Sequence, residues 1–208
     1  MTSRVLQEFP CVCADRPGVI IARGQRCQVV RGMADKLIEK QVLFDGKKVR
    51  LELHRFEDDD TGRRSQREVI VHPGAVVILA VLDDGQIVLI RNRRHILNQY
   101  LIELPAGTLE KGEDPINCAG RELLEETGYV ASRLKQIGSF FSSPGIMTEK
   151  MYAYAAYDLQ KSQQQLEDYE EIEVMTVPFE EAMNMIRDGR IVDGKTIATL
   201  LMYDRFKR

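Results

Sequence analysis

The chain has 208 residues, 44% of them hydrophobic and 29% charged, and its formal net charge is −3. This length and apolar content can bury a full core, and they suggest one domain plus an appendage. The charge gives no electrostatic footprint for nucleic acid. The longest apolar run, residues 75 to 82, is too short to cross a bilayer, and the first residues lack the apolar segment of a signal peptide. We therefore expect a cytoplasmic protein that binds neither nucleic acid nor membranes.

A predicted hairpin dominates the first part of the chain. Residues 1 to 35 contain short strand-like segments to which we assign no function. Between residues 40 and 56, apolar residues alternate on both sides of Asp45-Gly46, which is a strong signal for a two-residue turn. The apolar positions are Val42, Phe44, Val49, Leu51 and Leu53. They predict a hairpin with one apolar face, followed by a solvent loop over residues 57 to 65.

Strands continue beyond this loop. A strand begins at Arg67 and is interrupted by His72-Pro73-Gly74. Residues 75 to 81 form a continuous apolar run bounded by turn residues, which is typical of a buried strand, and a turn then leads into its partner. The later predicted elements are strands at 134 to 141 and 151 to 159, and helices at 179 to 187 and 195 to 206. The helices should cover the sheet.

The best-defined element is a helix predicted over residues 115 to 127. Asp114 is a good N-cap, Pro115 suits the first helical position, and Gly128 is the small residue expected just beyond the end. Along this helix Ile116, Ala119 and Leu123 recur as one apolar stripe that should face a core.

The same helix carries three carboxylates, Glu122, Glu125 and Glu126, on another face that we expect to be open to solvent. Like charges at this spacing weaken a helix by about a few tenths of a kcal/mol per pair. The arrangement is best explained by a hard cation, and oxygen-rich sites suit magnesium or manganese. The alternative is a solvated acidic helix face, which is common in proteins.

Four cysteines could form two bridges or contribute to a metal site. They are Cys11, Cys13, Cys27 and Cys118. Because the sequence has no C-x-x-C pair and no matching histidine cluster, we predict free thiols.

The spacing of residues around the acidic helix resembles the Nudix box, the signature of hydrolases that cleave a nucleoside diphosphate linked to another group. The matching positions are Gly107, Glu113, Arg121, Glu122, Leu123, Glu125, Glu126 and Gly128, and Tyr129 stands where the pattern usually has an aliphatic residue. The resemblance implies an α+β fold, an α/β/α sandwich with a mixed central sheet. We expect this domain at residues 71 to 208, preceded by a β-rich dimerisation region at residues 1 to 70.

Two further segments, REVIVHPGAV and IRNRR, are similar to the ADP-ribose pyrophosphatase branch of that family. A proline shortly after the box, Pro144, is also typical of this branch. The resemblance implies that Arg67 and Arg94 bind the phosphates or the nucleoside, and it places Arg91 and Glu149 among the candidate substrate-binding residues.

An acidic loop over residues 162 to 171 offers the next candidates. In the resembled enzymes this loop carries a pair of glutamates, one binding metal and the other implicated as a base. Here the pair is Asp168 and Glu170. Because the aspartate side chain is shorter than glutamate, we assign the metal-binding or base role to Glu170. Glu149 is the next candidate for the base. A merely solvated loop is the alternative.

The resemblance implies a catalytic set and a metal set that overlap. The predicted catalytic residues are Glu122, Glu125, Glu126, Glu170 and Arg121. The predicted ligands of Mg²⁺, with Mn²⁺ possible, are the Ala106 carbonyl and Glu122, Glu126, Glu125 and Glu170. Arg121 would hold a box glutamate in place, and Glu113 would brace the loop.

The implied reaction is hydrolysis of ADP-ribose, a small-molecule nucleoside diphosphate compound, to AMP and ribose 5-phosphate. Two alternatives remain open: another substrate, such as a nucleotide sugar or an oxidised nucleoside triphosphate, and a Nudix domain that only senses a nucleotide. We also expect a homodimer, because a hairpin with one apolar face must bury that face on something.

Overall fold

The computed structural model describes residues 35–46 and 49–206. These residues fall into two compact units: 35–40 with 54–67, and 41–53 with 68–206. Cys118 is a buried free thiol, as predicted, whereas the other three cysteines lie outside the described residues. Within the described part of the chain, no helix has the length and apolarity needed to span a membrane.

A three-stranded sheet is formed by β1 (Asp35–Asp45), β2 (Arg50–Asp58) and β3 (Arg64–Val71), in that order. The predicted hairpin is confirmed, but its turn was misplaced. The Gly46 N–H donates to the Val49 carbonyl at 3.0 Å, so the chain reverses after Gly46. This register, continued along the hairpin, would place Phe44 opposite Leu51, whereas a turn at Asp45-Gly46 would have placed Phe44 opposite a lysine.

The predicted solvent loop over residues 57 to 65 is shorter than expected. Both flanking strands extend into it, to Asp58 and from Arg64. The Asp58 carboxylate closes the turn, accepting hydrogen bonds from the Thr61 N–H at 2.6 Å and the Thr61 hydroxyl at 2.7 Å. A side chain that satisfies the turn allows the strands to pair further than the polar composition indicated.

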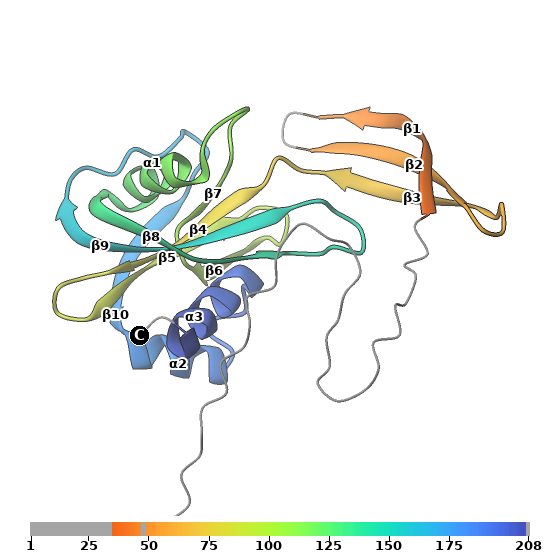
Figure 1. Cartoon of the computed structure of the whole chain (residues 1–208). Helices are drawn as coiled ribbons and strands as arrows, with labels where there is room; N and C mark the ends of the chain where they lie inside the picture. The colour runs from red at the N-terminus through yellow and green to blue at the C-terminus, as the bar shows by residue number, and fades with distance from the viewer. Residues whose placement is uncertain (1–34, 47–48, 207–208) are drawn as a thin grey trace, which may run out of the picture. The chain divides into compact units, whose positions relative to one another are not determined.

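The second sheet is mixed, as predicted (Figure 1). Its strands are β4 (Ala75–Val81), β5 (Gln86–Arg94), β6 (Gln99–Glu103), β7 (Ala106–Thr108), β8 (Tyr129–Phe141), β9 (Lys150–Lys161) and β10 (Ile172–Pro178). The order is β10-β5-β4-β9-β8, with β6 paired to β5 and β7 paired to β4. The β4–β9 pair is parallel, and the other pairs are antiparallel.

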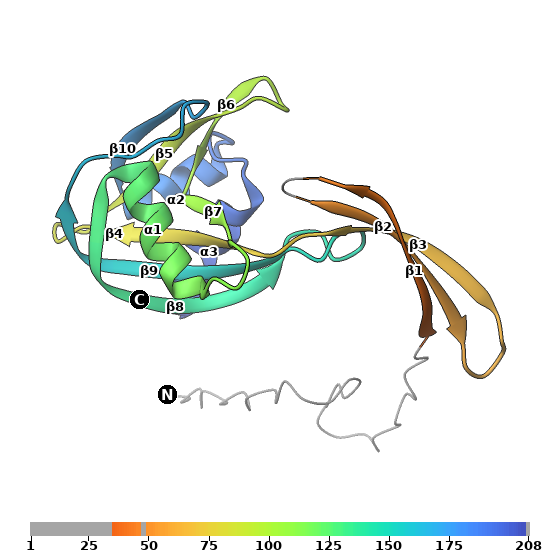
Figure 2. The ribbon, with the colours of Figure 1, turned by 90° about the horizontal axis from the view of Figure 1, so that it is seen from above.

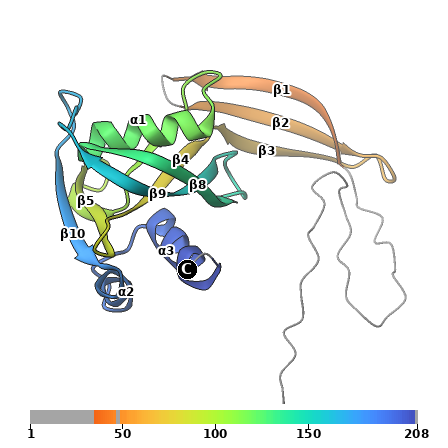
Figure 3. The same cartoon turned by 60° about the vertical axis from the view of Figure 1, so that its left-hand side comes forward.

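Helix α1 (Pro115–Thr127) covers one face of this sheet, and α2 (Phe179–Arg187) and α3 (Gly194–Phe206) cover the other (Figures 1 and 3). Strand β4 supplies both cores, because its side chains alternate between the two faces. Val77 and Leu79 pack with α2 and α3, whereas Val76 and Ile78 pack with α1. Burial on both faces explains the continuous apolar run, and the layers form the expected α/β/α sandwich.

The ends of α1 lie where they were predicted. The Asp114 side chain accepts a hydrogen bond from the Ile116 N–H at 3.1 Å, and Gly128 adopts a left-handed φ of 70° with its N–H on the Leu124 carbonyl. The apolar stripe was partly wrong. Ile116 is 42% exposed and Cys118 is fully buried, because the covered part of the helix begins at Cys118 and not at Ile116. Figure 2 shows α1 lying across the sheet.

Candidate active site

Two adjacent cavities lie beside α1 and α3, with volumes of about 610 and 770 Å³. The larger is lined by carboxylates of Glu122, Glu125, Glu126 and Glu170, and the smaller by Glu149 and aromatic side chains of β8. The residues common to both are Arg94, Ala106, Gly107, Thr108, Asp193 and Lys195. Most of the side chains singled out in the sequence are therefore brought to one concave surface.

Arg121 connects three glutamates of the predicted box. Its Nη1 lies 2.8 Å from Glu122 Oε1 and 2.9 Å from Glu125 Oε2, and its Nε and Nη2 each lie 3.0 Å from the Glu113 carboxylate. The hydrogen bond from Arg121 lowers the pKa of Glu113 to about 2. Glu113 also accepts the Glu110 N–H at 2.9 Å, which ties the loop before α1 to the helix. This geometry matches the bracing roles expected for Arg121 and Glu113.

Gly107 is needed because Glu122 passes directly over it. A Cβ built on Gly107 would lie 1.8 Å from Glu122 Cδ, far closer than any real contact. Gly107 is in β7, paired with Val76 of β4, so its backbone is held in the sheet. Close approach of a functional side chain to the backbone is a standard reason for glycine.

Glu126 is the most deeply placed carboxylate of the cluster. It is only 5% exposed, so the expectation that it shares an open helix face with Glu122 and Glu125 was wrong. Its Oε2 accepts the Ala106 N–H at 2.8 Å. Burial nevertheless raises the pKa of Glu126 to about 8, and the neighbouring Glu122 and Glu170 charges add to this effect. Burial also raises the pKa of Glu122.

The backbone of Ala106 is directed toward this cluster. In the β4–β7 ladder, the hydrogen bonds are made by the residue pairs on either side of Val77–Ala106 and Ala75–Thr108. The Ile78 N–H donates to the Pro105 carbonyl, and the Leu109 N–H donates to the Gly74 carbonyl. Because bonded and non-bonded pairs alternate in an antiparallel ladder, the polar groups of Ala106 point away from β4. The N–H to Glu126 follows this rule, and the Ala106 carbonyl points to the same side.

The loop after β9 is attached to the end of α1. The Gln165 N–H donates to the Glu125 carbonyl at 3.0 Å, and Gln164 Nε2 donates to the Glu126 carbonyl at 2.7 Å. A Cβ on Gly128 would lie 2.9 Å from the Gln164 nitrogen, so glycine is required there for this contact as well as for its φ. The loop brings Glu170 into the larger cavity, while Asp168 is exposed and does not line it.

The other predicted substrate-binding residues lie in different surroundings. Arg91 stacks on Tyr100, 3.9 Å from the ring centroid, and pairs with Glu173 at 3.0 Å outside both cavities. Arg67 is exposed, and its Nη1 donates to the Gln66 carbonyl.

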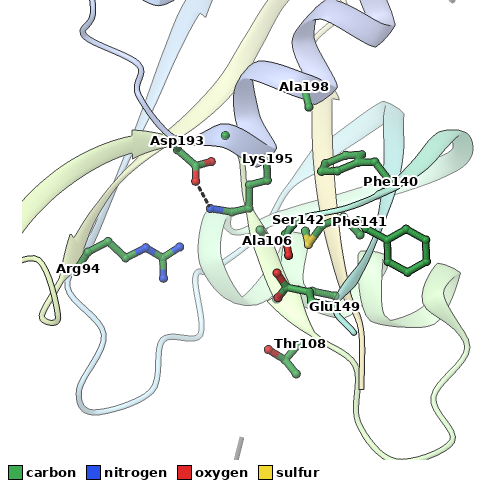
Figure 4. Close-up of a pocket in the computed structure, with 14 residues that line it drawn as sticks. Arg94, Ala106, Thr108, Phe140, Phe141, Ser142, Glu149, Asp193, Lys195 and Ala198 are labelled. Carbon is green, nitrogen blue, oxygen red and sulfur yellow. Dashed lines mark ion pairs between the residues drawn. The ribbon is translucent and has the colours of Figure 1, made fainter. Parts of the chain in front are cut away.

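Glu149 lines the smaller cavity, on the side opposite Arg94 in Figure 4. The Nε2 of His72 lies 3.6 Å from Glu149 Oε1. The Nδ1 of His72 accepts the Gly74 N–H at 3.1 Å, which leaves the hydrogen of a neutral imidazole on Nε2, facing the carboxylate.

An ion-pair network around a buried glutamate, at the edge of both cavities, was not predicted. Glu103 of β6 is fully buried and bonded to Arg94, with Nε–Oε1 at 2.7 Å and Nη2–Oε2 at 2.5 Å. Lys195 donates to the same carboxylate and lies 2.9 Å from Asp193 Oδ1. The hydrogen bond to Glu103 raises the pKa of Arg94. One sequence signal was available: Glu103 interrupts the apolar stretch Leu101-Ile102-Glu103-Leu104.

The donor set suits a hard cation. No group of three or more His, Cys, Asp or Glu among residues 35–46 and 49–206 is gathered as a ready metal cage, since Glu122 and Glu125 turn toward Arg121. However, the pKa values of partly buried Glu122 and buried Glu126 are raised, and a nearby cation would reverse this. Carboxylate and carbonyl oxygens are the ligands that Mg²⁺ prefers.

Carboxylates gathered beside arginine and lysine in one concave surface are the groups that a site for anionic phosphate compounds and a divalent cation would use. The NUDIX domain family matches residues 71–200, more than half of the chain. The chain therefore belongs to the NUDIX family. Nudix hydrolases generally need divalent metals.

Similar proteins agree with this membership. The chain is 38% identical over 169 residues to an ADP-ribose pyrophosphatase of Bacillus subtilis (strain 168), covering 80% of this chain and 91% of the relative. It is 37% identical over 165 residues to a methanol dehydrogenase activator of Bacillus methanolicus, covering 78% and 89%. A crystal structure of an ADP compounds hydrolase superposes with a TM-score of 0.73 at 21% identity, covering 83% of this chain and 93% of that one, which shows the shared fold.

Proposed function

We propose that this chain is a pyrophosphohydrolase that cleaves ADP-ribose to AMP and ribose 5-phosphate, using Mg²⁺, with Mn²⁺ as the alternative metal. The observation that carries the proposal is the gathering of Glu122, Glu125, Glu126 and Glu170 in one cavity whose edge is cationic. The similarity to the Bacillus subtilis ADP-ribose pyrophosphatase supports the choice of substrate. A cytoplasmic location and a dimerisation region at residues 1 to 70 remain part of the proposal.

The metal would be held by Glu122, Glu126 and the Ala106 carbonyl, with Glu125 and Glu170 completing the site. Bound there, a divalent cation supplies neutralisation of the diphosphate and a lower pKa for the attacking water. Arg121 keeps Glu122 and Glu125 oriented. Arg94 binds the diphosphate from the edge of the cavity, and Glu170 takes the proton of the water that attacks.

A panel of nucleoside diphosphate compounds, incubated with and without Mg²⁺ and analysed by product identity, tests this proposal. We expect ADP-ribose to be turned over fastest, to give AMP and ribose 5-phosphate, and to be left intact in EDTA. Faster turnover of a nucleotide sugar or an oxidised nucleoside triphosphate would reassign the substrate. Tight binding of ADP-ribose with no product would instead support the nucleotide sensor.

The base is tested by comparing two loop variants. We expect Glu170→Gln to lower kcat by about a hundredfold or more, within the usual range for a general base, and Asp168→Asn to lower it much less. The reason is position, because Glu170 lines the cavity and Asp168 is exposed outside it. The opposite ranking would transfer the role to Asp168. Equal and trivial effects would make Glu149, on the wall of the adjoining cavity, the next residue to replace.

A homodimer is supported by the surface of β1. Every residue of this strand is exposed, and it lies at the edge of its sheet. Its exposed apolar side chains are Leu37, Ile38, Val42, Leu43 and Phe44, each between 40% and 61% exposed. An apolar edge strand is a surface that soluble proteins normally cover. We propose that a second copy of the chain covers it and that Arg67 serves the partner's active site.

Mixing two inactive chains tests this arrangement. An Arg67→Ala chain and a Glu126→Gln chain, refolded together, should recover about one quarter of wild-type activity, because half of the dimers are mixed and each has one intact site. Each chain alone serves as the control. Sedimentation at micromolar concentration as a fully active monomer would contradict the proposal.

A further inference from the structure

The network around Glu103 presents two cations at the boundary of the two cavities. Glu103 is fully buried on β6, Arg94 comes from β5, and Lys195 comes from the start of α3. Arg94 donates hydrogen bonds to the Glu103 carboxylate from Nε and Nη2. Lys195 donates to the same carboxylate and pairs with Asp193. Figure 4 shows Lys195 and Arg94 entering the cavity from separate elements.

Both cations keep donors that the network does not use. Arg94 has five N–H groups, and the two bonds to Glu103 leave the whole of Nη1 and one hydrogen of Nη2. Lys195 has three donors, of which Glu103 and Asp193 take two. The Lys195 side chain is 17% exposed and that of Arg94 is 39% exposed, and both residues line both cavities. Their remaining donors are available to a ligand at this boundary.

Burying the charged Glu103 side chain costs free energy that apolar residues in the same space would not cost. An ion pair with a fully buried carboxylate is commonly no more stabilising than apolar residues of the same volume, because the buried charge loses its hydration. It does fix the positions of the long and flexible Arg94 and Lys195 side chains. Cations whose positions are fixed in advance bind an anion without further ordering cost. The burial of Glu103 is therefore better explained by the two side chains that it orients than by packing.

The charges on either side suggest what these donors bind. The glutamate cluster lies in the larger cavity, and the residues shared with it include Ala106 and Gly107, next to Glu126 and Glu122. A diphosphate neutralised at the cluster would extend its remaining oxygens toward the shared boundary. Arg94 and Lys195 are the cationic side chains that line both cavities.

We propose that Lys195 is a substrate-binding residue that contacts the diphosphate beside Arg94, and that Glu103 is the positioning residue that orients both cations. This inference rests on the proposed function and adds to it a second cation for the same substrate. Nudix-box residues supply the metal side of the site, whereas this contact comes from α3, a part of the chain that the sequence analysis assigned only to covering the sheet.

The test compares Lys195→Met with Lys195→Arg. For each variant we would measure kcat and KM for ADP-ribose with Mg²⁺, and the Kd of the non-hydrolysable α,β-methylene analogue of ADP-ribose by calorimetry. Loss of one charge-assisted hydrogen bond should raise KM and Kd by about ten- to a hundredfold in Lys195→Met. The change in kcat should be smaller, and Lys195→Arg should recover most of the affinity.

Two controls separate binding from structure. Lys135→Met removes an exposed lysine of β8 outside both cavities and should leave KM and Kd unchanged. The double variant Glu103→Gln with Lys195→Met removes one negative and one positive charge together, so its melting temperature should stay near that of the wild type. It should bind the analogue at least as weakly as Lys195→Met, because Arg94 also loses the carboxylate that orients it. Wild-type affinity in this double variant would overturn the inference.

Failure of the inference can be distinguished from failure of the proposed function. If the wild-type chain hydrolyses ADP-ribose and Lys195→Met binds the analogue equally well, the inference is wrong and the proposed function stands. If the wild-type chain binds the analogue in a Lys195-dependent way but gives no AMP, the hydrolase proposal is wrong and the binding role of Lys195 stands. A weakened Kd with melting temperature unchanged supports the inference.

Discussion

Replacing Glu126 by glutamine is expected to lower kcat/KM by at least about a hundredfold, because a catalytic metal supplies several kcal/mol of charge stabilisation. Glutamine has almost the same shape, and its side-chain oxygen can still accept the Ala106 N–H that Glu126 Oε2 accepts at 2.8 Å. The change therefore removes a charge from the cluster without removing a packing contact. Its effect should be on catalysis rather than on folding.

The direction in which this substitution changes the melting temperature can also be checked. Burial raises the pKa of Glu126 from 4.5 to about 8, so without a cation the folded state favours the protonated form. The contribution of Glu126 to the free energy of unfolding is full below pH 4.5 and is lost as the pH rises from 4.5 toward 8. Because glutamine is never ionised, Glu126→Gln should melt at the same or a higher temperature than the wild type at pH 7 in EDTA.

A matched control is Glu181→Gln on α2. It removes an exposed ion pair with Arg190, which is worth at most about 1 kcal/mol, and lies outside both cavities. Its kcat/KM should equal that of the wild type. A loss smaller than about tenfold in Glu126→Gln would contradict the metal assignment, since it is well short of what a metal site supplies.

Replacing Gly107 by alanine should lower kcat/KM by about a hundredfold, the size expected when a catalytic group is misplaced by about 1 Å. The added Cβ would lie 1.8 Å from Glu122 Cδ, and the backbone of β7 is held by its pairing with β4. The Glu122 side chain must therefore move, and with it the contact to Arg121 at 2.8 Å. Circular dichroism should show the fold unchanged, because the side chain can shift at less cost than the sheet.

The control for this variant is Gly120→Ala, in the helix that carries the glutamates. A Cβ on Gly120 would meet Leu134 Cδ1 at 3.7 Å, an ordinary contact, and alanine suits a helix better than glycine by roughly 0.5–1 kcal/mol. We expect unchanged activity and a slightly higher melting temperature. If Gly107→Ala were as active as Gly120→Ala, the position of Glu122 would not matter for turnover.

Elements with local causes could be predicted from the sequence. Helix α1 begins and ends at the predicted residues because its signals are in the adjoining residues: the Asp114 cap, Pro115 and the left-handed Gly128. Strand β4 was predicted as buried because its apolar run is continuous, and both cores do pack on it. The carboxylates of the Nudix box were found for the same reason, since their spacing on one helix is a local property.

Tertiary structure decided the features that depend on residues distant in the chain. Strands β6 and β7 are only a few residues long and form because β5 and β4 are beside them to pair with. Glu126 was expected on an exposed face, but it is buried where β7 approaches the helix and the Ala106 N–H donates to its carboxylate.

The ion-pair network likewise has a non-local cause. The network of Glu103, Arg94 and Lys195 joins β6, β5 and α3, with Lys195 separated from Glu103 by 92 positions. The sequence by itself therefore determined the helix that carries the carboxylates, because capping and periodicity act over a few residues. Only the folded sheet decided which carboxylates are buried and which cations face them, because burial and charge pairing depend on contacts between distant segments.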